Sequence, residues 1–420
     1  MNWNDLKKNN VTSIGGAVSG GLDSCTATHW LSSKGFSVHC ATVDLGQPDE
    51  ESLDAITKRM LACGADSATI IPGHQQLADA GLKVIQSQAR YEGGYWNTTG
   101  IARPITVRSI LPYLQDRDIP VFFHGATGRG NDQVRFQLAS NILAPRMEVY
   151  APWRDPTFVK EFPGRESMLD YCAKNNLPIK PASESRYSTD ANFLGLTHEA
   201  GDLEDVTIPP YFVEPGMGVW AWDAPDQPES LTIRWEEGIP VALNDSNLDS
   251  VNIFTEANSR AGRNGVGIGL HTVENRFVGV KSRGIYEAPG MELLGKSFEF
   301  LLQFVLDRRA RELYDYLSSF ISKQIYQGYW LDLATTSALE SLKPITRLAT
   351  GTIAVRMYKG SVYFESAEDT PEAMPSSVYT NDSSMEATGS YNHSDAEGFL
   401  KILGISAKTI GIKQFDKLDR

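Results

Sequence analysis

The 420-residue sequence is poor in cysteine and histidine, has no long hydrophobic run and has no surplus of positive charge. Its four cysteines are far apart and its seven histidines form no close pair, so we expect neither a disulfide framework nor a zinc site. No apolar run approaches the roughly 20 residues that span a membrane. The net charge of −13 disfavours tight binding of nucleic acid.

The location of the protein is also suggested by what its sequence lacks. The opening segment, MNWNDLKKNN, has no apolar stretch of the kind found in secretory signals. Scattered cysteines without disulfide spacing suit a reducing compartment. We therefore expect a cytoplasmic protein that binds neither membrane nor nucleic acid.

A glycine turn at residues 17–24, AVSGGLDS, is the most informative segment of the chain. Small and β-branched residues precede it, and a predicted helix over residues 22–34 follows and ends at Gly35. The glycines let the backbone approach an anion, and the free N–H groups of the first helical turn point at it. Asp23 fits such a site if a divalent cation lies between its carboxylate and a phosphate. The segment therefore predicts a nucleotide site that holds a leaving pyrophosphate with its metal.

The SGGLDS turn resembles the pyrophosphatase loop of the N-type ATP pyrophosphatases. That resemblance implies cleavage of ATP between its α and β phosphates, which activates an oxygen for amide or amidine formation. An ordinary tight strand-to-helix turn is the alternative, but serines and an aspartate at these positions favour the nucleotide site.

Strand-like and helix-like runs alternate in the first part of the chain, which predicts a parallel sheet covered by helices. The expected strands include residues 36–43, 67–71 and 121–124, and the expected helices include residues 51–63, 75–89 and 104–116. Ligands of such sheets bind at the carboxyl ends of the strands. Both the first glycine turn and a second one, residues 125–130, fall there.

The rest of the chain has a different texture, and two prolines near residues 177–183 predict a junction before it. From about residue 185 to 365 we expect an α+β arrangement. The expected strands are residues 231–235, 251–254, 278–280 and 352–357, and a long helical pattern spans residues 293–322. Residues 366–395 are polar and predict a loop. A last helix over residues 397–403 is expected to end at Gly404.

The second glycine turn opens a cluster at residues 124–136, HGATGRGNDQVRF. Its glycines let the backbone lie against a ligand, and Asn131, Asp132 and Arg135 project from the start of one predicted helix. Arg135 can bind a carboxylate through two hydrogen bonds, and Asp132 can pair with an ammonium group or accept its proton. The cluster predicts a site for both charged ends of an amino acid. A solvated helix start with a surface ion pair is the alternative.

Three further polar segments are YWNTTGIARP at residues 95–104, YSTDANFLGLTHEAG at 187–201 and VENRFVGVKSRGIYEAPG at 273–290. The first predicts a helix begun by Pro104 with an anion site before it. Each alone could be a surface loop. Together with HGATGRGNDQVRF, APWRDP and EAGDLED, they resemble the argininosuccinate synthase family over nearly the whole chain. That family joins citrulline to aspartate, using ATP and releasing AMP and pyrophosphate.

The resemblance implies an α/β nucleotide-binding domain like that of the adenine nucleotide alpha hydrolases at residues 1–178. It implies an α+β synthetase domain for substrate binding and multimerisation at residues 179–365, then a polar loop and a helical oligomerisation tail at residues 366–420. It further implies a ligase of arginine biosynthesis that forms a citrullyl-AMP intermediate, uses ATP and Mg²⁺, and assembles as a homotetramer.

The family's site residues carry over where the sequence matches. Those implied for ATP are Ala17, Ser19, Gly20, Gly21, Asp23, Ser24, Val43, Gly125, Thr127, Asp132 and Asp190. Those implied for aspartate are Thr127, Asn131 and Asp132. Those implied for citrulline are Tyr95, Thr99, Asn131, Arg135, Ser188, Thr197, Glu199, Glu274 and Tyr286. We expect Asp23, Asp132 and Arg135 to be catalytic, with Asp23 holding magnesium through phosphate.

The sequence departs from the family pattern at a few positions. Val18 stands where the family has tyrosine, Cys25 replaces serine, and Gly100 replaces a common serine next to the expected citrulline pocket. These departures leave open a paralogous ligase that joins aspartate to another ureido compound. A catalytically silent nucleotide or amino-acid sensor is a further alternative, although the retained Asp23 and Asp132 argue against it.

Overall fold

The computed structural model describes residues 1–48, 52–128, 130–179, 186–368, 370–380, 382–383 and 392–414. The chain divides into two compact units, Met1–Ser376 and Ser377–Arg420. Arg129 of the second glycine turn lies outside the described residues, as do parts of the expected junction and of the polar loop. The domain boundaries at residues 178 and 365 remain predictions.

A five-stranded parallel sheet in the order β3-β2-β1-β4-β5 confirms the predicted α/β class. Its strands are β1 (Ser13–Ala17), β2 (Ser37–Asp44), β3 (Ser67–Pro72), β4 (Val121–His124) and β5 (Glu148–Tyr150). Small residues in β1 allow its close approach to β4, because a Cβ on Gly16 would lie 2.3 Å from the carbonyl oxygen of Phe123. The first predicted nucleotide turn follows directly on this central strand.

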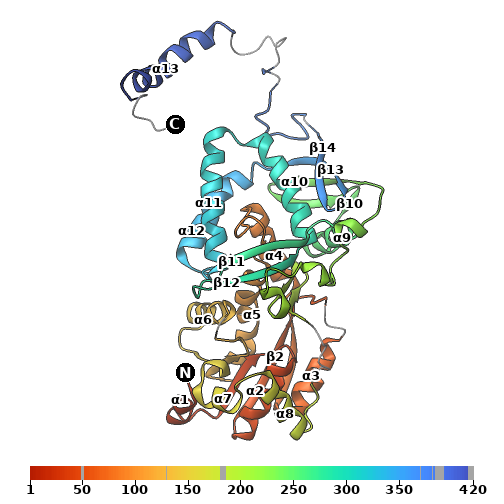
Figure 1. Cartoon of the computed structure of the whole chain (residues 1–420), viewed down its shortest axis with the longest axis vertical. Helices are drawn as coiled ribbons and strands as arrows, with labels where there is room; N and C mark the ends of the chain where they lie inside the picture. Colours follow the sequence, from red (N-terminus) through yellow and green to blue (C-terminus); the bar gives the residue numbers. More distant parts are fainter. Residues whose placement is uncertain are drawn as a thin grey trace. The chain divides into compact units, whose positions relative to one another are not determined.

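Helices cover both faces of the parallel sheet (Figure 1). They are α1 (Trp3–Lys8), α2 (Leu22–Ser33), α3 (Leu53–Ala62), α4 (His74–Gln86), α5 (Thr98–Gln115), α6 (Asp132–Leu143), α7 (Pro156–Glu161) and α8 (Arg165–Lys174), with the 3₁₀ turn η1 (Pro152–Arg154). Trp30 of α2 and Cys172 of α8 lie in one core cluster, and Leu77 of α4 and Ile110 of α5 lie in another. The sheet is therefore buried on both sides, as its apolar strands predict.

Helix α5 begins six residues before the predicted start at Pro104. Asn97, in the left-handed conformation, precedes the helix and donates from Nδ2 to the carbonyl oxygens of Ala89 and Ser322. The amide of Thr99 donates to the hydroxyl of Tyr95. Contacts with distant residues therefore anchor the helix start, and they override the local signal of the proline.

The remainder of the first unit has two antiparallel sheets, which confirms the α+β prediction. The first has the order β11-β12-β7-β6, with β6 (Ser188–Asn192), β7 (Gly195–Glu199), β11 (Ile268–Asn275) and β12 (Lys281–Glu287). The second has the order β10-β9-β8-β13-β14, with β8 (Glu229–Glu236), β9 (Ile239–Leu243), β10 (Ser246–Asn247), β13 (Gly351–Tyr358) and β14 (Ser361–Ala367).

The helices of this part are α9 (Ser250–Arg263), α10 (Pro289–Val305), α11 (Arg308–Tyr326) and α12 (Leu333–Thr346), with the 3₁₀ turns η2 (Gly201–Glu204), η3 (Pro210–Phe212) and η4 (Ala221–Asp223). The expected strand at residues 251–254 is wrong, because Asp249 caps α9 by accepting from the amide of Asn252. The single helix expected over residues 293–322 is wrong as well. Leu306 is extended, and Asp307 caps a new helix by accepting from the amide of Ala310.

The strand expected at residues 278–280 is also wrong, because these residues form the turn between β11 and β12. Gly279 has a φ of +91°, which a glycine adopts without strain. The amide of Arg276 donates to the carbonyl oxygen of Val280 and closes the turn. The strands of this hairpin are its two flanks, one of which carries Glu274 and the other Tyr286.

The second unit contains helix α13 (Asp395–Gln414), which continues through Gly404 instead of ending there. None of its described residues is buried within this chain. Across the described residues, no helix is long and apolar enough to cross a membrane.

Candidate active site

A cavity of about 510 Å³ lies where the carboxyl ends of β1, β2 and β4 face β7, β11 and β12. It brings together nearly all of the residues predicted from the sequence. Those lining it are Ala17, Ser19, Gly21, Asp23, Ser24, Val43, Tyr95, Thr99, Gly125, Thr127, Asn131, Asp132, Arg135, Asp190, Thr197, Glu199, Glu274 and Tyr286. Gly20 and Ser188 are the two predicted site residues that do not line it.

Gly20 shapes the nucleotide turn from behind the cavity. Its φ of +71° strains any residue with a Cβ, and its carbonyl oxygen accepts from Nη1 of Arg59 at 2.6 Å. The amide of Ser19 donates to the Ser24 hydroxyl at 3.1 Å, which closes the turn over the start of α2. These bonds hold the backbone of the turn in place at the helix N-terminus, a position that favours anions.

Asp23 lies in the first turn of α2 and faces the cavity. Its Oδ1 accepts from Nε1 of Trp153 at 2.8 Å, which gives the APWRDP segment a role at the site. Burial raises the pKa of Asp23 above its ordinary value, although the bond from Trp153 opposes this. A carboxylate destabilised by burial gains from a nearby cation.

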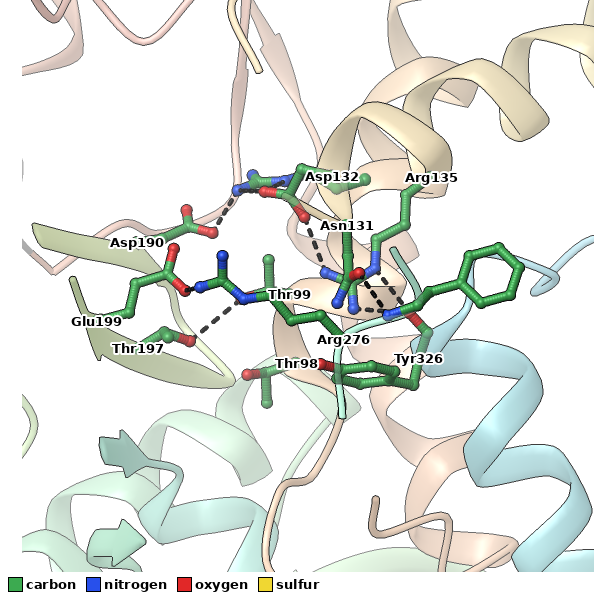
Figure 2. A network of polar contacts seen from close by, with 12 residues as sticks. Thr98, Thr99, Asn131, Asp132, Arg135, Asp190, Thr197, Glu199, Arg276 and Tyr326 are labelled. Atoms are coloured by element: carbon green, nitrogen blue, oxygen red, sulfur yellow. Dashed lines mark hydrogen bonds and ion pairs between the residues drawn. The ribbon is translucent and has the colours of Figure 1, made fainter. Parts of the chain in front are cut away.

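Asp132, at the start of α6, lies between two arginines (Figure 2). Arg103 donates to its Oδ2 from Nε and Nη2, and Arg135 donates to its Oδ1 from Nη1 at 2.8 Å. Burial alone would raise the pKa of Asp132, but the two guanidinium groups lower it to about 2. Arg103 also donates to Asp190 of β6, so it links the two aspartates. Asp132 is thus an anchored anion and a very weak base.

Arg135 uses most of its hydrogen-bond donors within the protein, so fewer remain for a ligand carboxylate than on an unpaired arginine. Its Nε and Nη2 donate to the carbonyl oxygen of Tyr326 at the end of α11, at 3.2 and 2.8 Å. With the bond to Asp132, three of its five N–H donors are used within the chain. The other two remain for a ligand. Asn131 beside it accepts from the amide of Phe277 at 3.0 Å, which ties α6 to the β11–β12 turn.

Aromatic rings form the wall of the cavity near Glu274. Tyr95 stacks on Tyr286 with 4.2 Å between ring centroids, and the Tyr286 hydroxyl donates to Glu274 at 2.6 Å. Thr99 and Thr197 share a hydrogen bond of 3.3 Å beside them. This wall offers hydroxyl and carboxylate groups at fixed positions, as binding of a polar amino acid requires.

Glu199, at the end of β7, forms an ion pair of 2.9 Å with Arg276 of the β11–β12 turn (Figure 2). Burial raises the pKa of Glu199 to about 7. Arg276 opposes this rise, whereas Asp132, Glu274 and Asp190 add to it. The carboxyl group therefore titrates near neutral pH.

His124 lines the cavity at the end of β4 and was not among the predicted site residues. Its Nδ1 accepts from the amide of Ala126 at 3.2 Å, so the neutral ring carries its proton on Nε2. That Nε2 is buried and has no hydrogen-bond partner among the described residues. Burial lowers the pKa of His124 to about 3, so the ring stays neutral.

Three further residues of the cavity that we did not predict from the sequence are Arg103, Arg276 and Tyr326. Arg103 and Arg276 belong to the quoted segments, and their neighbours Thr99 and Glu274 were a usable signal. Tyr326 had no such signal, because it reaches the cavity only through the fold of α11.

Gly100 does not line the cavity, although its replacement of serine raised the question of the substrate. A Cβ at Gly100 would lie 3.2 Å from Cγ2 of Ile325 and 3.3 Å from its carbonyl oxygen. The glycine therefore fits the close packing of α5 against α11. Ser188, opposite Glu199 in the β6–β7 pair, is exposed at the rim.

The parallel sheet, the glycine turn at its central strand and the adjoining polar cavity define a HUP-type nucleotide-binding domain joined to an α+β domain. Comparison with family models supports this division into two kinds of domain. Residues 13–178 match the "Arginosuccinate synthase N-terminal HUP domain" and residues 187–410 match the "Arginosuccinate synthase C-terminal domain".

Relatives that align over nearly the whole chain belong to the same family. An argininosuccinate synthase of Rhodopirellula baltica is 39% identical over 398 residues, which cover 94% of this chain and 97% of the relative. One of Thermotoga sp. strain RQ2 is 34% identical over 402 residues, 93% of this chain and 96% of the relative. The chain belongs to the argininosuccinate synthase family.

Proposed function

We propose that this protein condenses citrulline with aspartate to argininosuccinate, converting ATP to AMP and pyrophosphate. The observation that carries the proposal is the single cavity that joins the nucleotide turn to an amino-acid-binding set of arginines, carboxylates and tyrosines. A ureido carbon is a poor electrophile, so its oxygen must first be activated. An ATP site that opens directly onto an amino-acid site suits that activation.

In the first step, the citrulline ureido oxygen attacks the α phosphate of ATP and pyrophosphate leaves. Backbone N–H groups of the turn at residues 19–21 and the N-terminus of α2 stabilise the charge on the leaving pyrophosphate. Citrulline is held at the Tyr95–Tyr286 wall, where Glu274 and Arg135 provide opposite charges for its ends.

Magnesium fits this site as a companion of the nucleotide. Asp23 is a buried carboxylate beside the turn, and no group of three or more acidic, cysteine or histidine side chains in the described residues would hold a metal by itself. Asp23 would help to hold the ion, which would neutralise charge on the leaving pyrophosphate.

In the second step, the aspartate nitrogen attacks the activated carbon and AMP leaves. Thr127, Asn131 and Asp132 are the proposed aspartate site, and all three line the same cavity as Glu199 and Thr197. Because the cavity is continuous, all three substrates meet in one place, which supplies much of the acceleration.

Similarity along the whole chain favours this function over the paralogous ligase and the silent sensor. Pyrophosphate release from ATP, measured with citrulline or aspartate omitted in turn, tests the proposal. We expect release to require citrulline and argininosuccinate to appear only with both amino acids. Release that needs a different ureido compound would overturn the choice of citrulline, and no release with any set would overturn catalysis.

The predicted homotetramer and cytoplasmic location also remain proposals. Helix α13 exposes seven large apolar side chains, which is unusual for a helix that stays in water. They are Phe399, Leu400, Ile402, Leu403, Ile405, Ile410 and Ile412. We propose that they pack against other copies of the chain in the tetramer.

A further inference from the structure

We propose, resting on the function above, that Glu199 is the general base that takes a proton from the ammonium group of aspartate. The freed electron pair of that nitrogen then forms the C–N bond to the activated carbon of the citrullyl-AMP isourea. The C–O bond to AMP breaks, and its electron pair leaves with the phosphate oxygen. A second proton of the attacking nitrogen moves to the imine nitrogen, so the products are a guanidinium and AMP.

A base is needed because aspartate enters with a protonated nitrogen, which has no electron pair for attack. Arg103 and Arg135 together donate four hydrogen bonds to Asp132 and Asp190, which makes these two aspartates poor acceptors of a further proton. Asp132, which the sequence suggested for orienting and deprotonating the amine, has a pKa of about 2. Asp132 can therefore orient the amine, but it is too weak a base to deprotonate it.

Glu274 is the next carboxylate to consider. Its side chain is only 6% exposed, and its Oε2 already accepts from the Tyr286 hydroxyl at 2.6 Å. Glu199 differs from it in both respects. Its side chain is 41% exposed, into the cavity, and its Oε1 accepts no hydrogen bond from any residue that the structure describes. Among these four carboxylates, Glu199 presents the most accessible oxygen to a ligand.

The surroundings of Glu199 suit reversible protonation. Arg276 faces it from the β11–β12 turn, Glu274 from β11, Asp190 from β6 and Asp132 from α6. Three anions and burial outweigh one cation, which gives the raised pKa of about 7. A base with a pKa near the working pH combines enough of the unprotonated form with enough proton affinity. The same acid group can release its proton once the products leave.

Separate measurements of the two steps of the reaction distinguish a base role of Glu199 from simple binding of citrulline. Citrulline-dependent exchange of labelled pyrophosphate into ATP, without aspartate, reports the first step and needs no base for the amine. Argininosuccinate formation reports both steps. The amide of Glu199→Gln keeps the size of the side chain and its ability to hydrogen-bond citrulline, but it cannot take up a proton. We therefore expect exchange within about threefold of the unmodified enzyme, and argininosuccinate formation lowered about 100-fold or more. Glu312→Gln, an exposed change on α11, is the matched control.

Two further readouts sharpen the test. In the unmodified enzyme, the rate of the second step rises with pH through about 7, because Glu199 must be unprotonated, and this rise is lost in Glu199→Gln. Hydroxylamine is already neutral at pH 7, so its reaction with citrullyl-AMP should survive in the variant.

Equal losses of exchange and of argininosuccinate formation in Glu199→Gln would overturn the base role and make the residue a citrulline ligand. Full activity of the variant would overturn it too. Absence of citrulline-dependent exchange in the unmodified enzyme would instead overturn the proposed function, and the base role with it.

Discussion

Arg103 donates two hydrogen bonds to a single carboxylate oxygen of Asp132, at 2.9 Å from Nε and 2.8 Å from Nη2. The same guanidinium also contacts Asp190, so one side chain of α5 fixes carboxylates from α6 and β6. This link joins the nucleotide-binding domain to the first antiparallel sheet at the cavity. The geometry of the proposed aspartate site therefore depends on Arg103, a positioning residue to which we assign no contact with the reacting atoms.

Replacing Arg103 with glutamine should lower argininosuccinate formation about 100-fold, since small displacements of a positioned substrate cost that much. Asp132 would lose two of its three charged hydrogen bonds, so its pKa should rise. Steady-state kinetics with varied aspartate measures the loss. Arg108→Gln, an exposed change on the same helix, is the control, and equal activities of the two variants would contradict the account.

Asp23→Asn should abolish most of the first step, with citrulline-dependent pyrophosphate exchange down about 100-fold, because the role proposed for this carboxylate is to hold the metal that accompanies the leaving group. Citrulline binding measured by calorimetry should change little, since Asp23 is not among the residues proposed to hold citrulline. Asp54→Asn, in the first turn of α3 and exposed, should leave both unchanged. Loss of citrulline binding in Asp23→Asn would show that this division is wrong.

His124 should make the protein sensitive to mild acid. Its pKa is about 3 in the folded protein and 6.5 in an ordinary histidine, so the unfolded chain takes up the proton first. The stability that it contributes is complete above pH 6.5 and falls by about 1.4 kcal/mol for each pH unit below that, until about pH 3.

Thermal unfolding midpoints of the protein and of His124→Phe, followed from pH 7 to pH 5, test this dependence. We expect the midpoint of the variant to fall less steeply, because phenylalanine stacks on Phe136 as the neutral imidazole does but cannot bind a proton. Parallel slopes would show that the ring is not kept neutral by the fold.

Helix α13 should govern assembly. Replacing Ile402 and Leu403 with aspartate places charge among its exposed apolar side chains and should dissociate the proposed tetramer, which sedimentation velocity would detect. Each apolar side chain buried at an interface contributes about 1.5–3 kcal/mol. Replacing Lys401 and Glu397, which pair with each other on this helix, with alanine is the control. A tetramer that survives the aspartates would place the interface elsewhere.

The sequence predicted the parallel sheet well, because alternating buried strands and helices leave a strong local pattern. The prediction from sequence failed where contacts between residues far apart in the chain determine where a helix begins or ends. Asn97 begins α5 through bonds to Ala89 and Ser322, and no window of sequence around Pro104 contains them. The extended Leu306 divides a helical pattern whose apolar spacing is continuous.

Nearly all of the residues proposed for the site from the motifs that resemble the family line the one cavity. Their electrostatic state was not predictable. The motif suggested Asp132 as a base, but its two arginine partners lower its pKa. The pKa of Glu199 is raised by burial, and three carboxylates on separate elements add to the rise. Such properties depend on distances that a sequence does not contain.

The central claim, that the ureido oxygen of citrulline attacks ATP, is tested most directly by following that oxygen. Citrulline labelled with ¹⁸O in its ureido group is turned over with ATP and aspartate, and the AMP is analysed by mass spectrometry. We expect each AMP formed to carry one ¹⁸O in its phosphate. Unlabelled AMP would contradict adenylation of citrulline and, with it, the proposed function.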